Sequence, residues 1–283
     1  MQIAVHWLPR FPTPTGKVGS LLRYFLHMAH FSGIPLDPCM GIMLVLSPFI
    51  GSFLSLLAFR LPRGEPIAIT RSRCRHCDAS LGVLDLVPLA SWLILRGRCR
   101  HCGAPISSSY PLFEIWAVMV VLWAASETTG PVLIATSVLG WTLTLIAVID
   151  WQYLIIPRSC LVFLASAGLI AVAAIDPAAL PDHILAGISA FAFLWTVGLI
   201  YALVRNREGL GRADPFLFGA IGMWVGWGGL AGTLLIASLS GLLVALAATL
   251  AGRMPKRETM LPLGSFLAGA AWLVWLYGPL IPS

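Results

Sequence analysis

The chain has 283 residues, a formal net charge of +6, 58% hydrophobic residues and only 11% charged residues. Soluble domains carry about 25% charged residues, so the composition excludes an ordinary soluble domain and predicts a protein that crosses the membrane several times. The apolar stretches are rich in Gly, Ala and Leu and lack period-two alternation, which favours membrane helices over strands. The positive charge does not indicate nucleic-acid binding, because most of it follows the predicted membrane topology.

We expect an all-α polytopic membrane protein with about eight transmembrane helices. A membrane helix needs about 20 apolar residues, and eight stretches approach that length. They are 39–59, 111–125, 131–149, 161–175, 183–204, 216–230, 232–251 and 260–277. The sixth and seventh form one run that is too long for a single span, and four glycines between 226 and 232 offer a place to turn.

Lys and Arg are distributed unevenly among the connections between these spans. Of the 18, eight fall in 60–100, one is Arg158, three fall in 205–212 and three in 253–257, whereas the short loops 126–130, 176–182 and 226–232 contain none. Cytoplasmic loops carry the excess of basic residues, so the basic connections are predicted to face the cytoplasm, with both termini outside. The basic N-terminal tail runs mildly against this orientation, and its stretch 18–31 is compatible with a short amphipathic helix.

The only sizeable polar segment lies between the first and second spans. It contains Cys74-Arg-His-Cys77 and, after 21 intervening residues, Cys99-Arg-His-Cys102. Two C-x2-C pairs are typical of a tetrahedral zinc site, and four cysteine ligands indicate a structural role for the ion. Disulfides are disfavoured because cytoplasmic thiols stay reduced, which leaves another metal, an iron–sulfur cluster or redox thiols as the alternatives.

These features divide the chain into four predicted parts. They are an N-terminal tail (1–38), a first transmembrane helix (39–60), a cytoplasmic four-cysteine zinc-binding loop (61–110) and a seven-helix membrane domain (111–283).

Two aspartates lie at span edges that are predicted to face the cytoplasm. Asp150 follows the third span and Asp214 precedes the sixth. Ionisable groups at membrane depth are costly and usually functional. Two such carboxylates can form an aspartyl protease pair, in which one activates water and the other donates a proton to the scissile carbonyl. The plainer interpretations are loop solvation for Asp150 and helix capping for Asp214, which Pro215 follows at the first helical position.

Several stretches between 50 and 230 carry a family resemblance. IGSFLSLLAFRLPRGEP at 50–66, the two CRHC repeats, YPLFE at 110–114, IDWQYLIIP at 149–157 and EGLGRADPFLFGAIGMWVGW at 208–227 follow one another in order. Together they resemble the type IV prepilin peptidases, membrane aspartyl proteases of the GxGD type. The resemblance implies an inner-membrane enzyme that cleaves the basic leader of type IV prepilins or type II secretion pseudopilins at the cytoplasmic face. It also implies methylation of the new N-terminus with S-adenosylmethionine.

The same resemblance implies roles for individual residues. Asp150 and Asp214 match the catalytic pair, and Cys74, Cys77, Cys99 and Cys102 match the zinc ligands. The methyltransferase function is associated with the region from Gly51 onward and with the loop 61–110. Glu114, in YPLFE, is interpreted as a supporting polar residue, and Asp85 and Glu65 as solvated residues or contacts for the methyl donor or leader. Membrane lipid is the other expected partner.

The chain departs from the family at a few positions near these motifs. Ser55 replaces an asparagine, Arg158 an acidic or amide residue, Ala213 a glycine and Phe216 a lysine, and Pro215 is unusual. These changes motivate a second hypothesis, a non-catalytic membrane zinc protein that acts in pilus or secretion assembly. A transporter that relays ions through the two aspartates is a third, and it gives no role to the cysteine loop.

Overall fold

The computed structural model describes residues 38–67, 73–74, 76–207, 209–252 and 261–278. These residues form helices and contain no β-strand beyond two isolated bridges, which confirms the all-α fold class. The predicted amphipathic helix at 18–31 lies outside the described residues. The four-part division of the chain stays a prediction.

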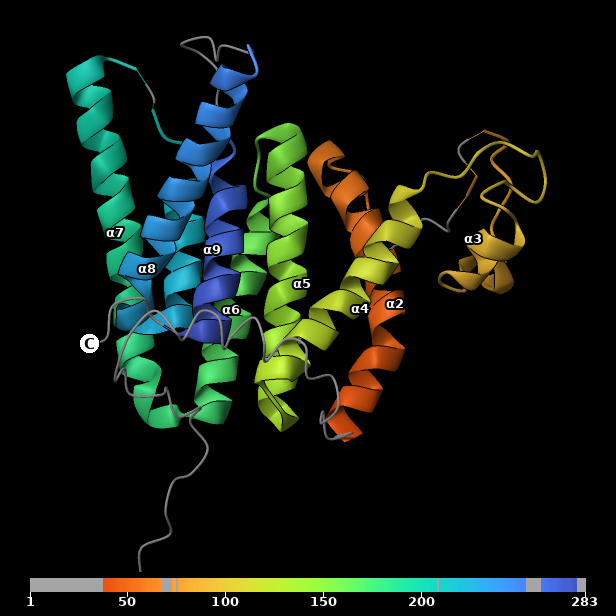
Figure 1. The fold of residues 1–283 in the computed structure, drawn as a ribbon, viewed down its shortest axis with the longest axis horizontal. Coiled ribbons are helices and arrows are strands. Elements are labelled where there is room, and N and C mark those ends of the chain that lie inside the picture. Colours follow the sequence, from red (N-terminus) through yellow and green to blue (C-terminus); the bar gives the residue numbers. More distant parts are fainter. Residues whose placement is uncertain (1–37, 68–72, 75, 208, 253–260, 279–283) are drawn as a thin grey trace, which may run out of the picture. The chain divides into compact units, whose positions relative to one another are not determined.

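Seven helices of 15 residues or more make up the described part of the bundle (Figure 1). They are α2 (Pro38–Arg60), α4 (Ser109–Glu127), α5 (Gly130–Tyr153), α6 (Arg158–Ile175), α7 (Leu180–Arg205), α8 (Asp214–Leu250) and α9 (Leu263–Tyr277). Six of them, all but α9, are long and apolar enough to cross a membrane. Helices suit this setting because they satisfy their backbone hydrogen bonds internally, where lipid offers no partner.

Smaller elements lie in the connections. The cysteine loop contains the 3-10 helices η1 (Leu61–Arg63) and η2 (Val83–Leu86) and the short helix α3 (Ala90–Ile94), and η3 (Pro177–Ala179) precedes α7.

Close backbone contact and indole hydrogen bonds join neighbouring helices. At Gly51 in α2, a Cβ atom would lie only 2.5 Å from the carbonyl oxygen of Phe113 in α4, so only glycine allows this approach. The Trp141 indole of α5 donates to the Ala117 carbonyl of α4 at 3.0 Å. The Trp224 indole of α8 donates to the Leu164 carbonyl of α6 at 2.8 Å.

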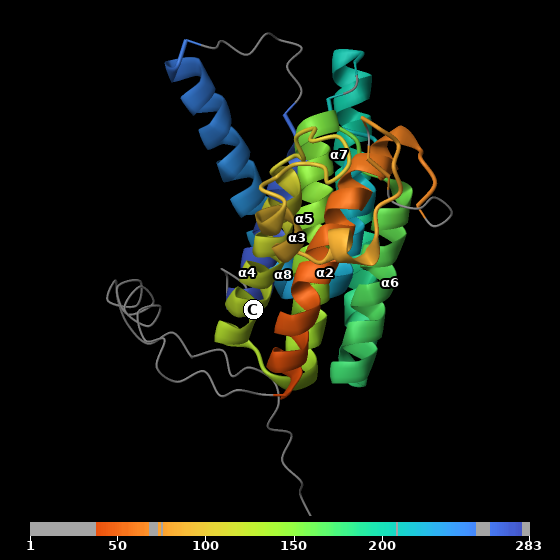
Figure 2. The ribbon, with the colours of Figure 1, turned by 90° about the vertical axis from the view of Figure 1, so that its right-hand side faces the viewer.

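Helix α8 is broken inside the run that was predicted to hold two spans. Gly226 has φ 63° and ψ −173°, a conformation that essentially only glycine adopts. Figure 1 shows the helix changing direction here, and Figure 2 shows its second part leaning away from the other helices. The Met223 carbonyl beside the break accepts a hydrogen bond from His183 Nδ1 at 3.1 Å. The predicted boundary was near residue 231, and the backbone instead breaks at the first of the four glycines.

We predict that Gly226→Ala destabilises the protein by about 1–3 kcal/mol, because alanine is strained in this conformation. Its apparent melting temperature in detergent should fall below that of the wild type. Gly269→Ala is the matched control, since a Cβ atom there meets nothing within 4 Å in the middle of α9. Equal melting temperatures for the two variants would contradict this explanation of the break.

Candidate functional site

Asp150 lies near the end of α5 and is only 5% exposed. Its Oδ2 atom accepts a hydrogen bond from the backbone N–H of Ser265 at 2.8 Å and lies 3.2 Å from the Ser265 hydroxyl. Ser265 is in the first turn of α9, where unpaired N–H groups and the helix dipole favour a negative charge. The site thus stabilises a carboxylate in an apolar bundle.

Gly264 makes this approach possible. A Cβ atom at Gly264 would lie 2.9 Å from Asp150 Oδ2 and 2.7 Å from the Cδ1 atom of Ile156, which is itself buried. Any side chain here would therefore push the start of α9 away from the carboxylate. Neither Gly264 nor Ser265 was expected from the sequence, whose only hint is a Gly-Ser pair at the start of the last apolar stretch.

Asp214 is the first residue of α8 and is 7% exposed. Its Oδ2 atom accepts a hydrogen bond from the backbone N–H of Gly211 at 3.1 Å. A Cβ atom at Gly211 would lie 2.8 Å from the same oxygen, so the backbone turns closely around the carboxylate. The prediction that Asp214 caps α8 is wrong, because the capping position is occupied by Ala213 and the Asp214 carboxylate binds the preceding turn instead of a free N–H of the helix.

The segment before Asp214 runs back along α7. The Arg207 guanidinium donates to the Tyr201 hydroxyl at 3.1 Å, and a Cβ atom at Gly198 would lie 3.3 Å from Leu210. Further along, the Phe216 ring packs against Phe191 with ring centroids 4.9 Å apart. Asp214 therefore lies beside the middle of α7 and not at its end.

The two aspartates are brought together from different helices. The Asp150 carboxylate lies close enough to Asp214 to interact with it electrostatically. Helix α9, which holds Asp150 through Ser265, also packs along α8. Two buried carboxylates with N–H donors that interact electrostatically have the residue types needed to activate a water molecule and to donate a proton.

Three of the residues that depart from the family pattern lie near Asp150 or Asp214 in the sequence, and the structure has a place for each. Pro215 is in the first turn of α8, where its missing N–H costs no helical hydrogen bond. Phe216 joins an aromatic cluster with Phe191 and Trp195 on α7. Arg158, at the start of α6, is exposed. Among the described residues, the hydrogen bonds to the two carboxylates come from Gly211 and Ser265 and not from these three.

The four loop cysteines form a cluster whose sulfur atoms all lie within 4.8 Å of one another. Their backbones are built alike: the Cys74 N–H donates to the Ala79 carbonyl at 2.9 Å, and the Cys99 N–H donates to the Ala104 carbonyl at 2.8 Å. The Cys74 and Cys102 sulfurs are 3.8 Å apart. Sulfurs at tetrahedral corners about 2.3 Å from one zinc ion would be separated by about 3.8 Å, so the cluster fits a metal site.

The thiols of the cluster differ in their pKa values. Backbone hydrogen bonds from His76 and Cys77 lower the pKa of the Cys74 thiol to about 6. The Ala79 N–H also lowers the pKa of the Cys77 thiol. Desolvation and the neighbouring thiols outweigh this hydrogen bond and raise the pKa of Cys77 to about 12. Four adjacent sulfurs cannot all ionise without a cation, so metal binding would displace protons.

The described fold and sites define a class: a polytopic helical membrane protein with a four-cysteine cluster that fits a metal ion and two buried aspartates. The Bacterial Peptidase A24 N-terminal domain matches residues 45–128, and the Type IV leader peptidase family matches residues 137–246. The chain therefore belongs to the type IV leader peptidase family, as its sequence motifs indicated.

Curated relatives agree with this assignment. A prepilin leader peptidase/N-methyltransferase of Burkholderia pseudomallei (strain 1026b) is 35% identical over 87% of this chain and 88% of its own length. Proteins of the same name from Stutzerimonas stutzeri and Aeromonas hydrophila are 33% and 31% identical, over 85% and 84% of this chain and 91% and 90% of their own lengths. No solved structure matches the chain.

We predict that Cys99→Ser removes the bound metal, because a serine hydroxyl is a poor replacement for a thiolate. Wild-type protein should carry about one zinc ion per chain and the variant less than about a tenth of that, measured by elemental mass spectrometry. Cys160→Ala is the control, since Cys160 is buried in α6, outside the cluster. Equal metal content in the two variants would argue against the four-cysteine site.

Proposed function

We propose that the chain cleaves the leader peptide of type IV prepilins or type II secretion pseudopilins, with Asp150 and Asp214 as its catalytic pair. The reaction takes place at the cytoplasmic face of the bacterial inner membrane. The same enzyme then methylates the new N-terminus with S-adenosylmethionine. The observation that carries the proposal is the pair of buried, hydrogen-bonded carboxylates from α5 and α8 in a chain of the type IV leader peptidase family.

The hydrogen bonds suggest a division of roles within the pair. Asp150 accepts from the Ser265 N–H and lies 3.2 Å from the Ser265 hydroxyl, which it shares with the Ala147 carbonyl at 2.9 Å, whereas Asp214 accepts from the Gly211 N–H. The extra donor favours Asp150 as the ionised member that activates water. Asp214 would then hold the proton and donate it to the carbonyl oxygen of the scissile bond.

The metal in the loop is assigned to structure and not to hydrolysis. Four soft thiolates at tetrahedral spacing suit zinc and fill its coordination sphere. A hydrolytic zinc ion needs an open position for water, which four cysteines do not leave. The ion would hold the two CRHC segments together, and the chemistry of cleavage would belong to the aspartates.

A non-catalytic role in pilus or secretion assembly is the alternative. It was motivated by the changes at Arg158, Ala213 and Phe216. The positions of Arg158 and Phe216 leave both carboxylates and their donors in place, so the peptidase is favoured. The cleavage assay below separates the two hypotheses.

We predict that Asp150→Asn and Asp214→Asn each lower leader cleavage by roughly 10²–10⁴-fold, because each removes one acid–base group. Purified variants in lipid nanodiscs would be incubated with a prepilin substrate, and leader loss would be read by mass spectrometry.

Asp182→Asn is the matched control, since Asp182 is exposed near the start of α7. Normal cleavage by either variant of the pair would refute the catalytic assignment. A wild-type protein that leaves all prepilin and pseudopilin substrates uncut would instead favour the non-catalytic alternative.

We predict a smaller effect for Ser265→Ala. This change removes the hydroxyl that lies near Asp150 but keeps the backbone N–H donor. Loss of one hydrogen bond to a charged group should lower the cleavage rate by about tenfold. In the control, Ser240→Ala, the lost hydroxyl only contacts a carbonyl of its own helix. Equal cleavage by the two alanine variants would exclude a role for the Ser265 hydroxyl.

A further inference from the structure

The connection between α7 and α8 lies against α7. Its described part, called here the connecting segment, consists of Arg207 and residues 209–213. The Arg207 guanidinium donates to the Tyr201 hydroxyl at 3.1 Å, and a Cβ atom at Gly198 would lie 3.3 Å from Leu210 Cδ2. The later residue of the segment thus contacts the earlier residue of the helix. The connecting segment therefore runs antiparallel to α7.

The Tyr201 ring packs closely against the backbone of this segment. A Cβ atom at Gly209 would clash with the ring. Gly209 is not among the glycines with a positive φ, so its backbone conformation would accept alanine without strain. The ring alone therefore makes glycine necessary at position 209.

One face of α7 receives both α8 and the connecting segment. Gly198 and Tyr201 lie three residues apart, and Gly187 lies eleven residues before Gly198, so all three are on the same side of the helix. At Gly187 the face meets α8, since a Cβ atom there would lie 2.9 Å from the Gly219 carbonyl oxygen. At Gly198 and Tyr201 it meets the connecting segment. Asp214 therefore lies between two contacts with the same helix face.

The connecting segment leads into the turn that binds Asp214. The Gly211 N–H donates to Asp214 Oδ2 at 3.1 Å, and the Asp214 N–H donates to the Gly211 carbonyl at 3.1 Å. These two bonds close a tight turn, in which the position of Gly211 sets the orientation of the carboxylate. Gly211 is only two residues beyond Gly209, where the Tyr201 ring packs.

The connecting segment buries little surface of its own. Four of its described residues are exposed: Arg207, Gly209, Gly211 and Arg212. Exposed segments with few buried apolar contacts open at low free-energy cost. The contacts with α7 therefore contribute much of what keeps the Gly211 N–H in place.

We propose that Tyr201 is a positioning residue for Asp214, because its ring and hydroxyl hold the connecting segment where the Gly211 N–H faces the carboxylate. This inference rests on the proposed function, since it assumes that Asp214 belongs to the catalytic pair. Tyr201 acts through the segment and not as a partner of the reacting groups. An error of about 1 Å in the placement of a catalytic group can lower a rate by about 100-fold, so such a role has a measurable effect.

The first test compares two substitutions of Tyr201 in full-length protein with a prepilin substrate in lipid nanodiscs. Tyr201→Leu removes both the ring and the hydroxyl, and we expect kcat for leader cleavage to fall about 30-fold with KM within about threefold of wild type. Tyr201→Phe keeps the ring and loses one hydrogen bond, so its kcat should stay within about fivefold of wild type. Leu203→Ala is the control, since Leu203 is on the same helix and 74% exposed.

Two outcomes of this test would overturn the assignment of Tyr201. One is cleavage by Tyr201→Leu at the rate of Leu203→Ala. The other is a raised KM with unchanged kcat, which would place Tyr201 in substrate binding. Failure of the wild-type protein to cleave any prepilin or pseudopilin would instead overturn the proposed function, so the two failures are distinguishable.

The second test uses the glycine that faces the ring. Gly209→Ala should lower kcat about 30-fold in the wild-type background, because the new Cβ atom forces the ring or the segment to move. Combined with Tyr201→Leu, the same change should lower kcat by less than about threefold further, since the ring is already absent. Gly41→Ala is the control, because a Cβ atom at Gly41 meets nothing within 4 Å. Equal effects of Gly209→Ala in the two backgrounds would overturn the proposal.

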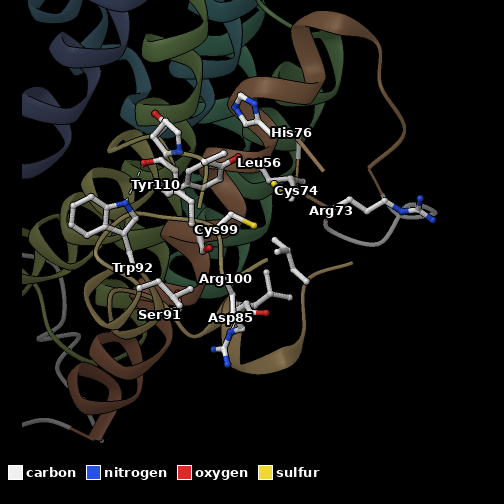
Figure 3. A pocket seen from close by; sticks show the side chains of 18 of the residues that line it. Leu56, Arg73, Cys74, His76, Asp85, Ser91, Trp92, Cys99, Arg100 and Tyr110 are labelled. Atoms are coloured by element: carbon white, nitrogen blue, oxygen red, sulfur yellow. Dashed lines mark hydrogen bonds and ion pairs between the residues drawn. The ribbon is translucent and has the colours of Figure 1, made fainter. Parts of the chain in front are cut away.

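The third test needs an internal reference away from α7, and the cysteine loop supplies one. A cavity of about 730 Å³ opens between this loop and the adjoining ends of α2 and α4, and its described lining residues come from these parts (Figure 3). Figure 3 labels Arg73 and Arg100 in this region, and their side chains are 59% and 52% exposed. Trypsin cleavage at these two arginines therefore reports on access to a part of the chain that Tyr201 does not contact.

Trypsin cleavage after Arg207 and Arg212 detects opening of the connecting segment without any substrate. Relative to cleavage at Arg73 and Arg100, we expect it to be about tenfold faster in Tyr201→Leu than in wild type, because the segment opens more often. Peptides would be quantified by mass spectrometry over time, and equal zinc contents would show that both proteins are folded. Equal relative rates in the two proteins would overturn the role of Tyr201 in holding the segment.

Discussion

The hydrogen bonds from the start of α9 to Asp150 hold the center of this bundle together. A carboxylate in an apolar environment needs donors, and Ser265 supplies a backbone N–H and a nearby hydroxyl. Gly264 lets the two helices approach closely enough for these contacts. Since α9 also packs along α8, the same contact positions the helix whose first residue is Asp214. A change at the start of α9 would therefore disturb both aspartates.

A second buried carboxylate, Glu114, joins the cysteine loop to α4 through a hydrogen bond. Glu114 fixes the backbone of Leu89, which adopts a positive φ of 58° just before α3. The cysteine cluster holds the rest of the loop through two matching turns. The loop is thus attached to α4 through a polar contact at its inner side, and the cysteine cluster draws its two ends together.

The features of the fold and site that could be predicted from the sequence were those that depend on residues close together in the chain. The cysteine spacing indicated the metal cluster, and apolar run lengths indicated most helices. The glycines near 226 indicated the break in α8, but its position depends on a backbone conformation that the pattern does not encode. The contacts of Ser265 and Gly264 were missed because they lie more than 100 residues from Asp150 in sequence. Only tertiary packing, which no local pattern shows, brings such groups together.

The packing of Phe216 against Phe191 shows where Asp214 lies along α7. Phe216 packs beside Phe191, about 14 residues before the end of α7, which corresponds to roughly 20 Å along that helix. Asp214 is therefore set several helical turns back from the C-terminal end of α7. Water has to reach this level along the polar segment that runs back beside α7. A group that reacts at Asp214 would therefore have to enter the bundle and could not remain at the tip of α7.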